Sequence, residues 1–296
     1  MQGLALLAVA ALGAASSLVS TFNGVIGTRL GSLRATWIFM SVGAFLALGV
    51  VAMTERHVFD LAVIQSLPLH AAAPGLLNTV AVATVIRVVP VIGTMQTVAT
   101  VFSGSVLVGI TLDHVGAFNL PAVASSPFRV MGAILLVSAV TLLAIAHRRR
   151  TSPELPVSIP ATLAAFTVGA MDNVAMAINA DVASSTGPFA ATVAFLLPGA
   201  IIIPLLQRRR DRFAITGVRP SDLLPGAYNV VAVAASTLLV PIVGLHLTNG
   251  TRFAAAILAG SVLDHFGVFG ASRFRWTRAR AAATTMLVTG VFVSTL

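Results

Sequence analysis

Charged residues are scarce in this chain of 296 residues: they make up 9% of it, whereas hydrophobic residues make up 57%. A soluble domain has roughly a quarter charged residues, so this composition excludes an ordinary soluble protein. The apolar residues gather in runs of about twenty. At about 1.5 Å per residue such a run crosses the roughly 30 Å hydrocarbon core of a bilayer. The sequence therefore predicts a membrane protein.

Cysteine and lysine are both absent. Without cysteine, disulfides and thiolate metal sites are excluded. All eighteen basic residues are arginines, and with nine acidic residues they give a net charge of +9. The arginines stand in short clusters between apolar runs, which is typical of topology signals and not of a nucleic-acid-binding surface. We therefore expect a lipid bilayer and a small-molecule substrate as partners, and no nucleic acid.

Common enzyme signatures are missing as well. The chain has no G-x-S-x-G elbow, no Walker-type phosphate loop and no H-E-x-x-H motif. The connectors between apolar runs are short and leave no soluble domain for catalysis or nucleotide binding. We expect no enzymatic activity, no cofactor and no metal site.

Ten apolar segments are predicted to span the membrane as helices, each bounded by charge, proline or glycine. Their expected ranges are 3–24, 35–53, 68–88, 91–112, 128–146, 158–180, 189–206, 223–240, 242–263 and 279–296.

The two halves of the chain repeat each other. With a shift of 151 residues, PGLLNTVAVAT from residue 74 aligns with PGAYNVVAVAA from residue 225. The same shift aligns Asp113-His114 with Asp264-His265. Self-similarity of this kind indicates a duplicated unit, here of five helices.

Five is an odd number, so the second repeat (residues 151–296) would insert upside down relative to the first (residues 1–150). The arginines support this orientation, because fifteen of the eighteen lie in or beside the odd-numbered connectors. By the positive-inside rule these connectors face the cytoplasm and both termini face outside. Inverted repeats are typical of secondary transporters, in which one half rocks against the other around a site near the midplane.

Three stretches give the chain a family resemblance: the PG-x-x-N-x-V-x-V-A span, the P-x-x-G span ending in D-H-x-G-x-F, and a first span with N-x-x-x-x-x-x-x-G. In these it resembles the YdcZ-like inner-membrane exporters, in their fused two-domain form, of the drug/metabolite transporter superfamily. The resemblance covers both halves and implies a multi-pass transport protein of a bacterial inner membrane. Glutamines that are frequent in the family pattern are replaced here by Val19, Ala175 and Ser105.

Asp172 lies well inside the sixth predicted span, in AFTVGAMDNVAMAIN, and its repeat counterpart is Ser16. A carboxylate in hydrocarbon is costly, and by default it has a function and faces the bundle interior or a wet cavity. The small multidrug transporters of the same superfamily resemble this chain in one respect: they carry an acidic residue midway along their first helix, where it exchanges protons for cations. We expect Asp172 to bind a proton or the charge of the substrate.

Arg252 is a second charge inside a predicted span, the ninth. Counted at 1.5 Å per residue, it lies about 15 Å from the outer end, and Asp172 about 12 Å. An ion pair between them would satisfy both charges, or it could open to receive substrate. The sequence leaves both interpretations open.

Further polar side chains lie in or at the edges of the predicted spans, where each needs a hydrogen-bond partner. They could line a substrate path or join helices, and the matched pair Asn78 and Asn229 is the better candidate for a central site because inverted repeats place matching residues about a pseudo-twofold axis. The set comprises Asn23, Asn78, Asn173, Asn179, Asn229, Gln96 and Tyr228.

Each Asp-His pair closes a predicted span and precedes a glycine suited to a left-handed helix cap. An aspartate at a helix C-terminus opposes the helix dipole, so we expect the adjacent His114 or His265, or an arginine such as Arg278, to compensate. Inversion would place Asp113 and Asp264 on opposite faces of the membrane. We expect helix-end roles for both pairs, with symmetric gates as the alternative.

These features favour an all-α membrane protein that acts as a secondary-active transporter and exports a small organic solute or cation, coupled to an ion gradient. The alternatives are an uncoupled facilitator or channel, and a membrane scaffold that transports nothing. The sequence specifies neither the substrate nor the coupling ion, and it leaves monomer and homodimer equally open.

Overall fold

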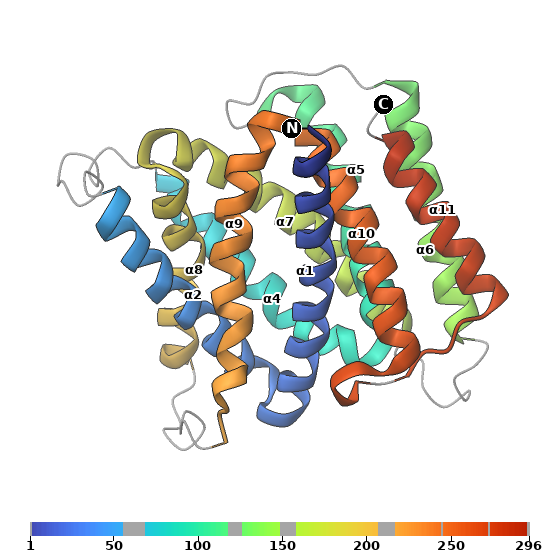
Figure 1. The fold of residues 1–296 in the computed structure, drawn as a ribbon, viewed down its shortest axis with the longest axis horizontal. Coiled ribbons are helices and arrows are strands. Elements are labelled where there is room, and N and C mark those ends of the chain that lie inside the picture. Colours follow the sequence, from blue (N-terminus) through green and yellow to red (C-terminus); the bar gives the residue numbers. More distant parts are fainter. Residues whose placement is uncertain are drawn as a thin grey trace.

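The computed structural model describes residues 2–55, 69–117, 126–148, 158–206, 217–243, 245–271 and 273–294. Within these ranges the chain forms α-helices and short 3-10 turns, and no strand occurs (Figure 1). The ten α-helices are α1 (Gln2–Leu30), α2 (Ser32–Thr54), α4 (Ala73–Ile92), α5 (Thr94–Val115), α6 (Pro127–Arg148), α7 (Ser158–Thr186), α8 (Pro188–Leu206), α9 (Leu224–Val243), α10 (Leu245–Phe266) and α11 (Arg278–Ser294).

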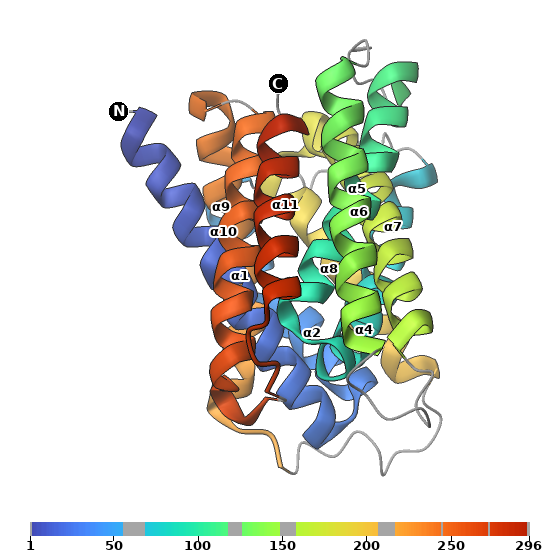
Figure 2. The same cartoon turned by 90° about the vertical axis from the view of Figure 1, so that its right-hand side faces the viewer.

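The helices form one bundle in which successive helices alternate in direction (Figures 1 and 2). The N-terminus and the C-terminus lie at the same end, the upper end in both views. Helices that are distant in sequence lie side by side: α1 packs along α10, α5 along α7, α2 along α8 and α6 along α11. Each of these pairs takes one helix from either half of the chain.

Among the residues that the structure describes, six helices are long and apolar enough to cross a membrane: α1, α2, α4, α5, α7 and α8. Their outer faces expose large apolar side chains, with Leu7 68% and Phe45 76% accessible. Such surfaces are stable only against lipid, because a soluble monomer rarely exposes extended apolar patches. The protein is therefore a multi-pass membrane protein.

Two helices are longer than their expected ranges of 3–24 and 158–180. Both continue for six further residues, α1 to Leu30 and α7 to Thr186. The polar Asn23 does not end α1, because it is buried inside the bundle. Asparagine is tolerated within a helix where neighbouring helices shield it from lipid.

Glycines let two helix pairs approach backbone to backbone. A Cβ atom on Gly13 of α1 would lie 2.1 Å from the carbonyl oxygen of Arg252 in α10. A Cβ atom on Gly169 of α7 would lie 1.8 Å from the carbonyl oxygen of Val101 in α5. Small residues permit such close packing in membranes. The glycines are 156 residues apart and their partners 151, which are the shifts of the sequence repeat.

A buried apolar cluster holds α6 and α11 against α5 and α10. It includes Met95 and Phe102 of α5, Leu136 of α6, Ile257 of α10 and Leu287 of α11. Because lipid tails are as apolar as these side chains, their packing, and not their removal from water, stabilises the contact.

Candidate functional site

Asp172 is the central residue of α7, fifteenth of its 29 residues. It lies about 21 Å along the helix from either end at 1.5 Å per residue, and not about 12 Å from the outer end as expected, because α7 continues to Thr186. Its side chain is only partly buried. Its carboxylate forms no hydrogen bond or direct ion pair with the residues that the structure describes.

Arg252 of α10 lies near enough for its charge to act on the carboxylate of Asp172. The same charge acts on the phenol of Tyr228 in α9. The guanidinium stands 5.1 Å from the ring centroid of Phe253, which is a cation–π distance. The structure thus brings Asp172 and Arg252 within electrostatic range of each other, although not at the depths counted from the sequence, and the two side chains do not bond directly.

Tyr228 connects α9 to α1 beside this charge pair. Its hydroxyl donates to the carbonyl oxygen of Leu12 at 2.6 Å and lies 2.9 Å from the hydroxyl of Ser16. Ser16 occupies the position in the first half that Asp172 occupies in the second. We call Ser16, Asp172, Tyr228 and Arg252 the central polar cluster.

Asn179 follows Asp172 by seven residues, or two turns, so the two side chains leave the same face of α7. Its Oδ1 atom has no hydrogen-bond partner, and among the described residues it is the one fully buried side-chain nitrogen or oxygen atom in this state. A buried acceptor without a partner costs free energy, about 1 to 3 kcal/mol. Asn179 therefore offers an acceptor that the folded chain leaves unused.

Asn173 has a different environment from its neighbour Asp172. Its Nδ2 atom donates to the hydroxyl of Ser105 in α5 at 3.0 Å. At the matching positions of the repeat, the hydroxyl of Ser17 in α1 donates to the carbonyl oxygen of Ala256 in α10 at 2.6 Å. These bonds join the same pairs of helices that the glycines bring together, so Asn173 connects helices.

Other polar residues singled out from the sequence also connect helices. Asn78 is buried and donates to the carbonyl oxygen of Phe195 in α8 at 3.1 Å. Gln96 donates to the hydroxyl of Thr162 in α7 at 3.2 Å. Asn229 is half-buried in α9. The bonds of Asn78 and Gln96 do not involve the central polar cluster. The matched asparagines Asn78 and Asn229, both in the described part of the chain, form no hydrogen bond with each other.

Asp264, in the last turn of α10, binds the N-terminus of α5. Its carboxylate accepts from the backbone N–H groups of Thr94 at 2.7 Å and Met95 at 3.1 Å. Gly93, with φ 86°, makes room, because a Cβ atom there would lie 2.6 Å from the carboxylate. The positive end of the α5 dipole thus compensates for the unfavourable position of Asp264 in its own helix. We call this contact the lower clasp.

An arginine also compensates Asp264, but it is Arg280 and not Arg278. Its guanidinium lies 3.1 Å from the carboxylate, and it also bonds the carbonyl oxygen of Phe274. His265 is engaged elsewhere and accepts from the backbone N–H of Trp276 at 3.3 Å. Arg278 is the first residue of α11 and Arg280 follows it by two residues, and α11 packs against α10, which carries Asp264.

The other Asp-His pair lies in the last turn of α5. His114 is exposed there. The side chain of Asp113 lies outside the described part of the chain, so its expected role stays a prediction.

Glu55, just after α2, was not singled out from the sequence. Its carboxylate accepts from the backbone N–H groups of Phe189 at 3.3 Å and Ala190 at 2.8 Å, in the first turn of α8. Gly187, with φ 96°, again lies against the carboxylate. The sequence gives two weak signals for this contact. Glu55 is a lone acidic residue after an apolar run, and Gly187 begins a Gly-Pro step before the apolar run of α8. We call this contact the upper clasp, because α2 ends at the upper end of the bundle and α10 at the lower (Figure 1).

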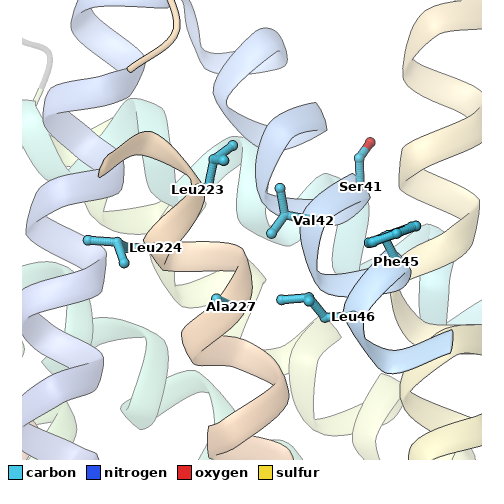
Figure 3. A pocket seen from close by; sticks show the side chains of 7 residues that line it. All are labelled: Ser41, Val42, Phe45, Leu46, Leu223, Leu224 and Ala227. Atoms are coloured by element: carbon cyan, nitrogen blue, oxygen red, sulfur yellow. The ribbon is translucent and has the colours of Figure 1, made fainter. Parts of the chain in front are cut away.

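An apolar groove opens on the side of the bundle between α2 and α9 (Figure 3). Its volume is about 450 Å³, and Ser41 is the one polar side chain of its lining. The remaining lining residues are Val42, Phe45, Leu46, Leu223, Leu224 and Ala227. The groove contains no charged or titratable group, so it does not provide a site for a proton or an ion.

The family model described as "Putative inner membrane exporter, YdcZ" matches residues 4–142 and 160–293. The chain belongs to the YdcZ family. The two matches cover both halves and agree with the fused two-domain form, and the resemblance seen in the sequence is thereby confirmed. No individually curated protein matches the sequence. Membership of an inner-membrane exporter family gives this membrane protein a general role in transport.

Proposed function

We propose that the protein is a secondary-active exporter of a small organic solute or cation, coupled to an ion gradient. In this proposal the chain crosses a bacterial inner membrane ten times, with both termini outside. Its halves, residues 1–150 and 151–296, are inverted repeats that expose a central site to either side in turn.

The matched helix contacts support the inverted arrangement. The contact of Gly13 with Arg252 corresponds to that of Gly169 with Val101. Both follow the repeat shifts of 156 and 151 residues. Since successive helices alternate in direction and each repeat has five, α1 and α7 point in opposite directions (Figure 1). Two halves related in this way can exchange conformations, which is the basis of alternating access.

The central polar cluster is the proposed substrate and ion site, and the unbonded carboxylate of Asp172 carries the proposal. Folding a carboxylate into the middle of a membrane helix without a hydrogen bond is costly. A group that supplies the missing bond, such as a proton or the cationic group of a substrate, would satisfy the carboxylate there. Arg252 and Asn179 would complete the site from α10 and α7.

The two clasps are the proposed gates. The lower clasp joins Asp264 of the second half to α5 of the first half, and the upper clasp joins Glu55 of the first half to α8 of the second. Each clasp therefore closes one end of the interface between the halves. In alternating access one clasp would open while the other stays closed.

The test is proton flux in proteoliposomes that contain a pH-sensitive dye and are challenged with a panel of small organic cations and amino acids. We expect at least one compound to move protons with the wild-type protein. Asp172→Asn should abolish that movement, whereas the matched control Asp181→Asn, nine residues further along α7, should preserve it. The proposal fails if no compound moves protons, or if Asp172→Asn behaves as the wild type does.

A further inference from the structure

We propose that the substrate of the central polar cluster is a small zwitterion, whose cationic group binds Asp172 and whose carboxylate binds Arg252. This inference rests on the proposed transport role and adds the substrate class to it. Asp172 and Arg252 carry opposite charges within the membrane-spanning part of the bundle.

Asp172 and Arg252 attract each other but do not bond. Arg252 acts electrostatically on Asp172. Neither side chain makes a hydrogen bond or direct ion pair with the described residues. If the pair served only to hold the bundle together, direct contact would be the favoured geometry, because buried charges need hydrogen bonds as well as opposite charge. The two charges are close enough to interact and do not form an ion pair, so a ligand that carries both charges could bridge them.

The unused bonding capacity of the two side chains defines that group. A carboxylate accepts up to four hydrogen bonds, and a guanidinium has five N–H donors in a planar fork that fits a carboxylate. A ligand that satisfies both must donate at one end and accept at the other. The unbonded Oδ1 atom of Asn179 lies two turns, about 10.5 Å, further along the same face of α7 and offers a separate acceptor to the rest of the ligand.

Charge balance favours a ligand with no net charge. The pair Asp172 and Arg252 is neutral in sum, and adding a cation alone would bring a second positive charge close to Arg252. An anion alone would lie close to Asp172 in the same way. Like charges in a medium of low dielectric constant repel strongly. A zwitterion fills both ends and keeps the site neutral.

The experiment uses the purified full-length protein and three matched sets of compounds: the standard α-amino acids, their amides as cations, and the corresponding carboxylic acids without the amino group as anions. Ligand binding is read as a rise in the thermal unfolding temperature. We expect at least one amino acid to stabilise the protein, and its amide and its des-amino acid to bind at least tenfold more weakly. Asp172→Asn and Arg252→Gln should each abolish the stabilisation, and Arg252→Lys should restore part of it.

The double variant Asp172→Asn with Arg252→Gln removes both charges together, so it leaves no unpaired charge in the bundle and should fold even if a single variant does not. It should retain an unfolding transition and lose the response to the amino acid. The inference is overturned if an amino acid stabilises the double variant as much as it stabilises the wild type. It is also overturned if no amino acid stabilises the wild-type protein. If amides bind wild type and Arg252→Gln equally, and Asp172→Asn still abolishes flux, the substrate is a simple cation: this inference fails while the proposed function stands.

Discussion

Asp264 and Thr94 lie 170 residues apart, yet the carboxylate of one accepts the backbone N–H of the other at 2.7 Å. The bond joins the last turn of α10 to the first turn of α5, and therefore the two halves of the chain. A second carboxylate, that of Glu55, makes the equivalent kind of contact with α8 at the opposite end. Carboxylates at helix N-termini are stabilised by the unpaired N–H groups and by the helix dipole.

The lower clasp should control access to the bundle from its own end. Thr21 is buried and its hydroxyl lies 2.7 Å from that of Thr94. Because the chain has no cysteine, Thr21→Cys places a single thiol behind the clasp. We expect this thiol to react slowly with a water-soluble maleimide, and severalfold faster when Asp264→Ala removes the clasp.

The upper clasp provides the control for this experiment. Thr186 is buried beside Gly187, so Thr186→Cys reports on that end. Glu55→Ala should increase the reactivity of this thiol and leave that of Thr21→Cys unchanged or lower. Equal increases at both ends would show general loosening of the bundle and would count against gating.

Asn179 should show a conflict between stability and function. Asn179→Leu has a similar volume and removes the unbonded acceptor, so we expect the unfolding temperature to rise by the equivalent of about 1 kcal/mol. Transport should fall, because the substrate loses that acceptor. Thermal unfolding and flux in proteoliposomes measure the two effects.

Asn78→Leu is the matched control for this prediction. Its Nδ2 atom already bonds the carbonyl oxygen of Phe195. The substitution should therefore lower the unfolding temperature. If both variants change the unfolding temperature in the same direction, the missing hydrogen bond of Asn179 does not determine how its substitution affects stability.

The glycine contact of α7 with α5 should tolerate no side chain. Gly169→Leu would push Val101 away, and overpacking of this kind costs about 1 to 3 kcal/mol. We expect the unfolding temperature to fall by several degrees. Gly49→Leu, on a part of α2 with nothing within 4 Å, should have little effect. Similar losses for both variants would contradict the close approach.

Much of this architecture could be predicted from the sequence because its signals are local. Apolar runs located the helices, and the repeat shifts related the two halves. The charges of Asp172 and Arg252 were visible as exceptions inside apolar runs. The prediction was wrong at the ends of α1 and α7, where the helices continue beyond the apolar runs. Polar residues such as Asn23 are buried within the bundle, so the limits of an apolar run do not mark the limits of the helix.

The clasps could not be predicted in the same way. The partner of Glu55 is the backbone of a helix 135 residues away, and a backbone N–H has no sequence signature. The same applies to Asp264, whose need for a compensating charge was predictable but whose main partners are Thr94 and Met95. Which of two nearby arginines reaches Asp264 depends on how α11 packs against α10, and this is a property of the folded bundle.

The most direct test of the inverted repeats compares two equivalent residues. Thr28 near the end of α1 and Ser184 near the end of α7 are both exposed and differ by the repeat shift of 156 residues. In intact cells, an impermeant maleimide should label Ser184→Cys from outside, and Thr28→Cys only after the membrane is made permeable. Labelling of both from the same side would contradict the inversion and the alternating-access proposal that depends on it.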